Sequence, residues 1–310
     1  MNFDFTTTLA GTIFPNPIFT ASGCAGSGKE LIQFFPLTDL GAVVTKSIML
    51  KPRSGRATPR MAETPSGMLN SIGLQGPGIA AFLQDDIPWL KSKGARIVVS
   101  IAGESVADYA ELARLISGVS GISAVEVNIS CPNVESRGQV FSCNPVTAHA
   151  AISAVKKNID PSLPIIAKLS PDVTDITEIA DVVINAGADG LALINTLLGM
   201  VIDTNSMKPK LAGKTGGLSG PAIRPVAVRA IYQVKARFPQ ISILGMGGVT
   251  NGREAFEMIL AGASAVSVGT ANFGNPLATM KIKAELQELL IERGFASVAA
   301  AVGYAHREED

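Results

Sequence analysis

The sequence predicts a (β/α)8 barrel, because three features point to a closed parallel sheet. Eight short apolar runs recur along the 310 residues, and most are near-continuous in Val, Ile, Leu and Ala. Strands covered on both faces have this composition. Segments with helical periodicity lie between the runs. Eight strand and helix units of fairly regular spacing favour closure into a barrel over the alternative, a doubly wound open sheet.

The predicted strands are short and bounded by Gly, Pro, Asn or Ser. In chain order they are Ile18–Ala21, Ala42–Lys46, Arg96–Ile101, Ala124–Ile129, Pro164–Leu169, Gly190–Asn195, Ile241–Gly245 and Ala265–Gly269.

Helices are predicted from apolar residues at i, i+3, i+4 and i+7. This spacing occurs in the sets Tyr109, Leu112, Ala113, Ile116 and Ile176, Ile179, Ala180, Val183. Asp175 and Asn251 each have a glutamate three residues later, which is typical of a helix N-cap. A last helix is predicted from Pro276 to Glu292.

Three connections are too long to be simple turns: Leu50–Gly78, Cys131–Pro145 and Thr196–Pro221. Each follows a strand, so each emerges at the carboxyl face of the barrel, where barrel active sites lie. We expect the three insertions to act together as a lid over one mouth. No linker or low-complexity segment interrupts the chain, and we predict one domain over residues 1–310.

Composition excludes several classes. Hydrophobic residues make up 47% and charged residues 17%, which suits a sizeable core. Lys plus Arg equals Asp plus Glu at 26 each, which gives no support to a nucleic-acid partner. The start resembles no signal peptide, and no apolar stretch has the length of a membrane span. The three cysteines fall in no CxxC pair. We therefore expect a cytoplasmic protein with no metal site.

Polar residues follow the apolar strands at the expected mouth, where a bound ligand would supply their partners. They are Ser22, Lys46, Ser47, Asn128, Cys131, Lys168, Asn195 and Thr196. A lone lysine at a strand end more often points outward to solvent, but two in one mouth suggest an anionic or electron-rich ligand such as a flavin. Cys131 is a candidate base or nucleophile, although an isolated cysteine is usually a small buried hydrophobe. Cys24 and Cys143 are assigned no role.

Glycines end the seventh and eighth predicted strands, at Gly247, Gly248 and Gly269, the last followed by Thr270. The simpler interpretation is that these glycines only form tight turns. Two such loops side by side, however, favour a phosphate cradle of backbone N–H groups. The segment Gly23–Gly28 has the wrong spacing for a dinucleotide fingerprint, so no NAD site is predicted.

Four motifs together resemble one family, the class 1 dihydroorotate dehydrogenases. They are Glu63–Gln75, Asn128–Val134, Ile194–Thr196 and Gly245–Val249. The resemblance runs in order from about Pro17 to Phe273. The membrane-bound class has serine at the position of Cys131 and an extra N-terminal segment, so this chain resembles the soluble class.

The resemblance implies oxidation of dihydroorotate to orotate in pyrimidine synthesis, with Cys131 taking the C5 proton and hydride passing from C6 to FMN. It implies that FMN is bound by Ser22, Lys46, Ser47, Ser100, Asn128, Lys168, Ile194, Gly220, Gly247, Gly248, Gly269 and Thr270. It implies that substrate is bound by Lys46, Asn70, Ser71, Ile72, Gly73, Leu74, Asn128, Asn195 and Thr196. Ser100 departs from the family's usual asparagine, and its shorter hydroxyl can still form a hydrogen bond.

Details of Pro59–Pro65, Gly73–Gly78 and Gly216–Pro221 resemble the NAD-linked kind most closely. That kind implies a partner subunit with FAD and an iron–sulfur cluster, in a heterotetramer of two plus two built on a homodimer of this chain. Three alternatives stay open: a fumarate-linked homodimer, a dihydropyrimidine dehydrogenase type of flavoenzyme, and a flavin-binding barrel without catalysis.

Overall fold

The computed structural model describes residues 3–130 and 141–307, so Cys131 lies outside the described residues. Eight parallel strands form one sheet in the order β3-β16-β15-β10-β9-β8-β7-β4. Their bounds are β3 (Ile18–Thr20), β4 (Val43–Val44), β7 (Ile97–Ile101), β8 (Ile122–Asn128), β9 (Ile165–Lys168), β10 (Gly190–Leu193), β15 (Ser242–Met246) and β16 (Ala265–Val268). A parallel bridge between Phe19 and Ala42 joins the two end strands. The predicted barrel is therefore confirmed over the open sheet.

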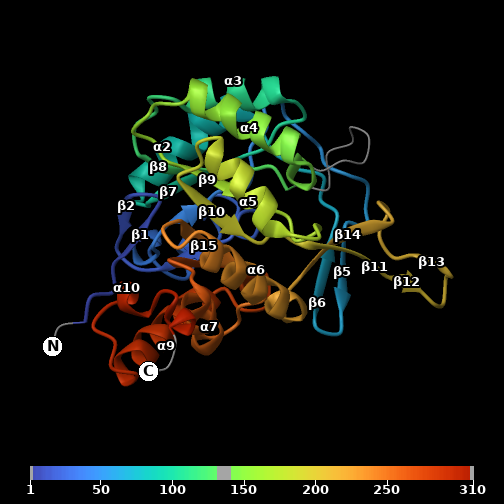
Figure 1. Ribbon diagram of the computed structural model, residues 1–310. Coiled ribbons are helices and arrows are strands. Elements are labelled where there is room, and N and C mark those ends of the chain that lie inside the picture. Colours follow the sequence, from blue (N-terminus) through green and yellow to red (C-terminus); the bar gives the residue numbers. More distant parts are fainter. Residues whose placement is uncertain (1–2, 131–140, 308–310) are drawn as a thin grey trace.

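Helices surround the barrel (Figure 1). They are α1 (Ile79–Ala81), a π-helical turn (Phe82–Asp86), α2 (Ile87–Ser92), α3 (Val106–Ile116), α4 (Pro145–Asn158), α5 (Ile176–Asn185), α6 (Arg224–Arg237), α7 (Gly252–Ala261), α8 (Ala271–Gly274), α9 (Ala278–Glu292) and α10 (Val298–Ala301). Both predicted N-caps form, since Asp175 accepts from the Thr177 N–H and Asn251 from the Glu254 N–H. The predicted last helix corresponds to α9, which begins two residues later than expected and is preceded by the short α8.

The first connection of the barrel differs from the prediction of eight alternating units. Between β3 and β4 the chain forms only 3-10 turns, at Leu31–Gln33 and Leu37–Asp39. Several glycines and Pro36 interrupt this segment, and both residue types disfavour a continuous helix. Further 3-10 turns are Phe141–Cys143, Pro221–Ile223 and Tyr304–His306.

Alternate residues of each barrel strand face two different cores. One face packs outward against the helices, as Val99 and Val127 do. The other face fills the barrel, where Val98, Ala124 and Ile166 belong to a separate buried cluster. An amino-terminal hairpin, β1 (Thr7–Leu9) and β2 (Thr12–Phe14), adds Leu9 and Phe14 to that inner cluster. The period-2 pleat of the strands accounts for this division.

Two of the three long insertions come together as expected, but as strands rather than as loops. Most of the remaining insertion, Cys131–Pro145, lies outside the described residues. β5 (Met61–Thr64) and β6 (Gly67–Asn70) come from the first insertion, and β11 (Leu197–Met200) and β14 (Thr215–Ser219) from the third. They form an antiparallel sheet in the order β11-β14-β6-β5. A hairpin of β12 (Ile202–Asp203) and β13 (Lys208–Pro209) projects beside it (Figure 1). Within the described ranges, no helix is both long enough and apolar enough to cross a bilayer.

Candidate active site

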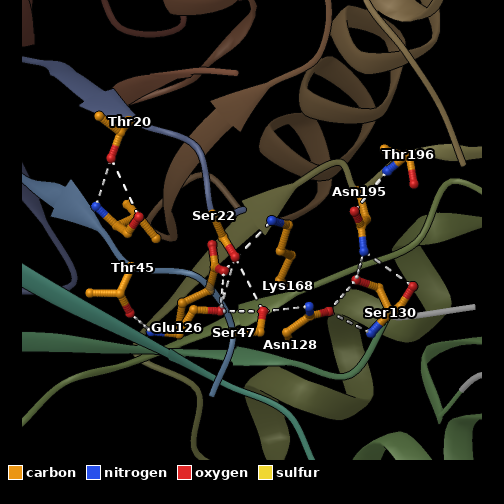
Figure 2. A network of polar contacts seen from close by, with 12 residues as sticks. Thr20, Ser22, Thr45, Ser47, Glu126, Asn128, Ser130, Lys168, Asn195 and Thr196 are labelled. Atoms are coloured by element: carbon orange, nitrogen blue, oxygen red, sulfur yellow. Dashed lines mark hydrogen bonds and ion pairs between the residues drawn. The ribbon is translucent and has the colours of Figure 1, made fainter. Parts of the chain in front are cut away.

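Polar residues replace apolar ones inside the barrel toward the carboxyl ends of the strands. Ser100 is two residues after Val98 on β7, and Lys168 is two residues after Ile166 on β9. β8 carries both Glu126 and Asn128. Because side chains two apart on a strand point to the same face, these polar groups all face the barrel interior. Figure 2 shows side chains from several strands joined in one network of polar contacts.

Three serine hydroxyls lie at the centre of the network. Ser47 Oγ is 2.8 Å from Ser100 Oγ, and Ser22 Oγ is 3.2 Å from Ser47 Oγ and 3.3 Å from Ser100 Oγ. Asn128 Nδ2 donates to Ser47 Oγ at 2.9 Å. Four residues predicted to bind flavin are therefore brought together from the first four barrel strands: Ser22, Ser47, Ser100 and Asn128.

A second branch of the network leads to the predicted substrate residues. Ser130 Oγ donates to Asn128 Oδ1 at 2.9 Å. Asn195 Nδ2 in turn donates to Ser130 Oγ at 2.8 Å, and Asn195 Oδ1 accepts from the Thr196 N–H at 2.8 Å (Figure 2). The two asparagine amides are thereby held in fixed orientations. Ser130 was assigned no role from the sequence, although it belongs to the motif Asn128–Val134.

The sequence reasoning also missed Glu126. Its side chain is fully buried, its Oε1 accepts from Ser100 Oγ at 2.7 Å, and the same atom lies 3.6 Å from Lys168 Nζ. Lys168 is only 4% exposed, so the predicted inward-facing lysine is confirmed in position. The available signal was a single acidic residue in an apolar run, two positions before Asn128 and hence on the same face.

A cavity of about 260 Å³ adjoins this network, since Ser22, Lys168, Asn195 and Thr196 line it. Its lining contains eight of the twelve residues predicted to bind FMN, together with two residues predicted to bind only the substrate. These residues are Ser22, Lys168, Ile194, Asn195, Thr196, Gly220, Gly247, Gly248, Gly269 and Thr270. Ser267 also lines it, and its buried Oγ has no hydrogen-bond partner among the described residues. A buried hydroxyl without a partner favours a bound polar ligand here.

The glycines on the cavity also serve packing. At Gly248, with φ of +76°, a Cβ would lie 2.6 Å from the Gly220 carbonyl oxygen. At Gly269 a Cβ would lie 3.2 Å from Cys24 Sγ. A positive φ at Gly248 and a close approach of neighbouring atoms at both positions therefore explain these glycines in part. Their shared position on one cavity wall, with Thr270 Oγ1 2.8 Å from Ser219 Oγ, is what a phosphate cradle also requires.

Cys24 lies on the cavity although the sequence gave no reason to assign it a role. Burial raises the pKa of the Cys24 thiol, and the nearby positive charges of Lys168 and Lys46 oppose that rise. A Cβ on Gly23 would lie 3.6 Å from Lys46 Nζ, which places this lysine beside the same turn. Both predicted lysines are therefore close to the cavity.

The segment Asn70–Leu74 begins on the insertion sheet and lies outside the lining of this cavity. Asn70 Nδ2 donates to the Gly217 carbonyl at 3.4 Å, and Arg56 Nη1 donates to Ser71 Oγ at 3.0 Å. Gly217 links this sheet to the mouth, because a Cβ there would overlap Thr196 Oγ1. The remaining predicted site residue, Cys131, lies outside the described residues, directly after Ser130.

Fold and site together define a (β/α)8-barrel protein with a polar ligand pocket at its carboxyl mouth. Within residues 3–130 and 141–307, no group of three or more His, Cys, Asp or Glu side chains is arranged to hold a metal ion. The family model for dihydroorotate dehydrogenase matches residues 4–290, and the chain belongs to this family of flavin-dependent oxidoreductases.

Curated relatives cover almost the whole chain. A protein of Desulforudis audaxviator is 49% identical over 96% of this chain and 96% of its own length. A protein of Bacillus pumilus is 48% identical over 97% of this chain and 96% of its own. A third, of Desulforamulus reducens, is 50% identical over 94% and 95%. Each is called the catalytic subunit of dihydroorotate dehydrogenase B (NAD(+)).

Proposed function

We propose that this chain oxidises dihydroorotate to orotate in pyrimidine biosynthesis, with FMN bound at the mouth of the barrel. The observation that carries the proposal is the continuous polar network from Ser22 to Thr196, which lies against one cavity. Network and cavity together contain residues of every family motif except Glu63–Gln75. A barrel that had lost catalysis would have no need for this ordered set of amides.

The residues of the cavity fit FMN. Its phosphate would be held on the glycine side, by Gly220, Gly247, Gly248, Gly269 and Thr270. The polar atoms of its isoalloxazine ring would face Ser22, Ser47, Ser100, Asn128, Lys46 and Lys168. Ser267 Oγ offers a further polar contact. When bound, FMN would accept the hydride from C6 of dihydroorotate.

The chain's own residues would bind the substrate and move its proton. Asn128 and Asn195 have fixed amide orientations and would hydrogen-bond the pyrimidine ring together with Thr196. Lys46 would attract the substrate carboxylate, and Asn70–Leu74 would complete the substrate site from the insertion sheet. Cys131 would take the proton from C5. Since a thiol is mostly protonated near neutral pH, turnover should rise with pH as thiolate forms.

For the electron acceptor, the names of the relatives favour NAD reached through a partner subunit. We propose that the partner carries FAD and an iron–sulfur cluster, that two copies of each subunit assemble on a homodimer of this chain, and that the complex is cytoplasmic. Residues 1–310 would form a single domain.

Steady-state assays with dihydroorotate test this proposal. The chain co-purified with its partner should reduce NAD, and the chain alone should not. Rapid fumarate reduction by the chain alone would favour the fumarate-linked alternative. Faster turnover of dihydrouracil than of dihydroorotate would favour the dihydropyrimidine dehydrogenase type.

A further inference from the structure

Glu126 is a buried acid that the proposed reaction leaves without a task. Its side chain is fully buried in the barrel. One carboxylate oxygen contacts Ser100 and Lys168, and the other, Oε2, has no hydrogen-bond partner among the described residues. A buried carboxylate is costly for folding unless it is paired, and an apolar residue of similar size is often at least as stable. Stability alone therefore does not explain a glutamate here.

We propose that Glu126 is a positioning residue that holds the Lys168 ammonium beneath the cavity and sets the direction of the hydrogen bonds across the mouth. The proposal rests on the proposed function, since it takes the bound group to be FMN.

The direction of the hydrogen bonds follows from the number of protons available. An ionised carboxylate only accepts, so Ser100 gives its one hydroxyl proton to Glu126. The contact of 2.8 Å between Ser47 and Ser100 must then be donated by Ser47, which in turn accepts from Asn128 Nδ2. Ser47 and Ser100 have then each donated their one hydroxyl proton, so Ser22 is the donor in its contacts with both.

The same logic continues to the substrate end of the network. With Nδ2 of Asn128 used toward Ser47, its Oδ1 is left to accept from Ser130. Ser130 then accepts from Asn195 Nδ2, and Asn195 Oδ1 accepts from the Thr196 N–H. Every donor therefore points toward Glu126. Backbone groups hold the two amides in the same orientations, since the Ser130 N–H donates to Asn128 Oδ1 at 3.2 Å and Asn195 Nδ2 donates to the Ser130 carbonyl at 3.2 Å. The carboxylate therefore sets the direction of the serine hydroxyls between them.

Charge gives Glu126 a second effect. Paired with Lys168 at 3.6 Å, it offsets the positive charge of that lysine and leaves Lys46 as the other cation close to the cavity. Without its negative charge, Lys168 would act on the flavin alone and favour the more negative reduced form. Glu126 should therefore lower the flavin reduction potential.

Two substitutions separate these effects. Glu126→Gln removes the charge, and its amide oxygen still accepts from Ser100, so the hydrogen-bond direction is kept. Ser100→Ala keeps the charge and removes the link to Ser47. We expect Glu126→Gln to raise the flavin midpoint potential by about 30 mV or more, which is a tenfold shift of a two-electron equilibrium. We expect Ser100→Ala to shift the potential less than Glu126→Gln does, because both charges remain, and to weaken orotate binding about tenfold.

The flavin-loaded chain is measured by equilibration with a redox dye and by orotate titration of the flavin spectrum. Distinct responses of the two variants support the proposal. An unchanged potential in Glu126→Gln would overturn the proposal, because the charge of Glu126 would then have no effect on the flavin. The same pair of changes in both variants would also overturn it, because a merely structural glutamate would change the potential and orotate binding together.

A thermodynamic cycle on the flavin-free full chain keeps the test independent of FMN. Urea unfolding is compared for Glu126→Gln, Lys168→Gln and the double variant. The double variant should lose less stability than the two single losses combined, because neither charge is left buried alone. Strict additivity would overturn the pairing even if FMN is reduced normally. Failure to bind FMN would instead refute the proposed function, whatever the cycle shows.

Discussion

The two ends of the barrel interior are built by the same strands and have opposite chemistry. At the amino-terminal end, Val98, Ala124 and Ile166 pack with the hairpin residues Leu9 and Phe14 in a wholly apolar cluster. Two residues further along the same strands, the interior is polar: Ser100, Glu126 and Lys168. Positions two apart are only about 6.6 Å apart along a strand. Folding and chemistry are therefore divided along each strand, and substitutions at the two ends should have separable effects.

The largest effect is expected at the mouth, at Cys131. Cys131→Ser should lower turnover near neutral pH by about 10³-fold, since the hydroxyl is a much weaker base, while FMN content stays the same. Steady-state rates with matched flavin absorbance measure this. Cys143→Ser, at an exposed thiol, is the matched control and should keep its rate. Normal turnover in Cys131→Ser would refute the assignment of the base.

The apolar end should respond in stability instead. Ile166→Ala should lower the free energy of unfolding by about 3 kcal/mol, because it leaves a cavity in the closed barrel. Ile166→Val is the control, with an expected loss of about 1 kcal/mol. Urea unfolding gives both values. If kcat per bound flavin fell in proportion to stability, the division between the two ends would be wrong.

Gly217 tests the link between the insertion sheet and the mouth. Gly217→Ala places a Cβ on Thr196 Oγ1, so Thr196 must move. We expect KM for dihydroorotate to rise about tenfold while FMN stays bound, since small misplacements of binding groups are costly. Gly76→Ala is the control, because the nearest atom to its Cβ is 4.0 Å away. An unchanged KM would remove Thr196 from the substrate site.

The smallest effect is expected on the outer layer, at the N-cap of α5. Asp175→Ala should cost about 1 kcal/mol of unfolding free energy, and Asp175→Asn less, because asparagine also caps. The hydroxyl and N–H of Thr177 lower the pKa of Asp175 below 3.8. Its ionised form therefore stabilises the fold above pH 3.8, and this contribution is lost as pH falls through the folded-state pKa. In urea unfolding across this range, the stability difference between the parent and the Asp175→Asn variant should shrink with acid.

The barrel was predictable because its strands are locally apolar and its helices locally amphipathic. The insertion sheet was not, because β14 contains Gly216 and Gly217 and pairs with β6, about 150 residues earlier in the chain. Local pattern contains little information about such distant pairing.

The site was predictable where polar residues ended a strand, as Asn128 and Lys168 do. Glu126 was missed because the run Ala124–Ile129 was interpreted as continuously apolar, although its period-2 position places it beside Asn128. Cys24 was missed because Gly23 indicates a turn after β3 but does not indicate which side chain that turn brings to the cavity.

Anaerobic titration of the flavin-loaded chain with dihydroorotate tests the central claim, that the polar mouth holds a flavin against this substrate. We predict that about one equivalent of dihydroorotate bleaches the visible absorbance of the bound FMN and that dihydrouracil leaves it unchanged. A flavin that stays oxidised in excess dihydroorotate would contradict the account.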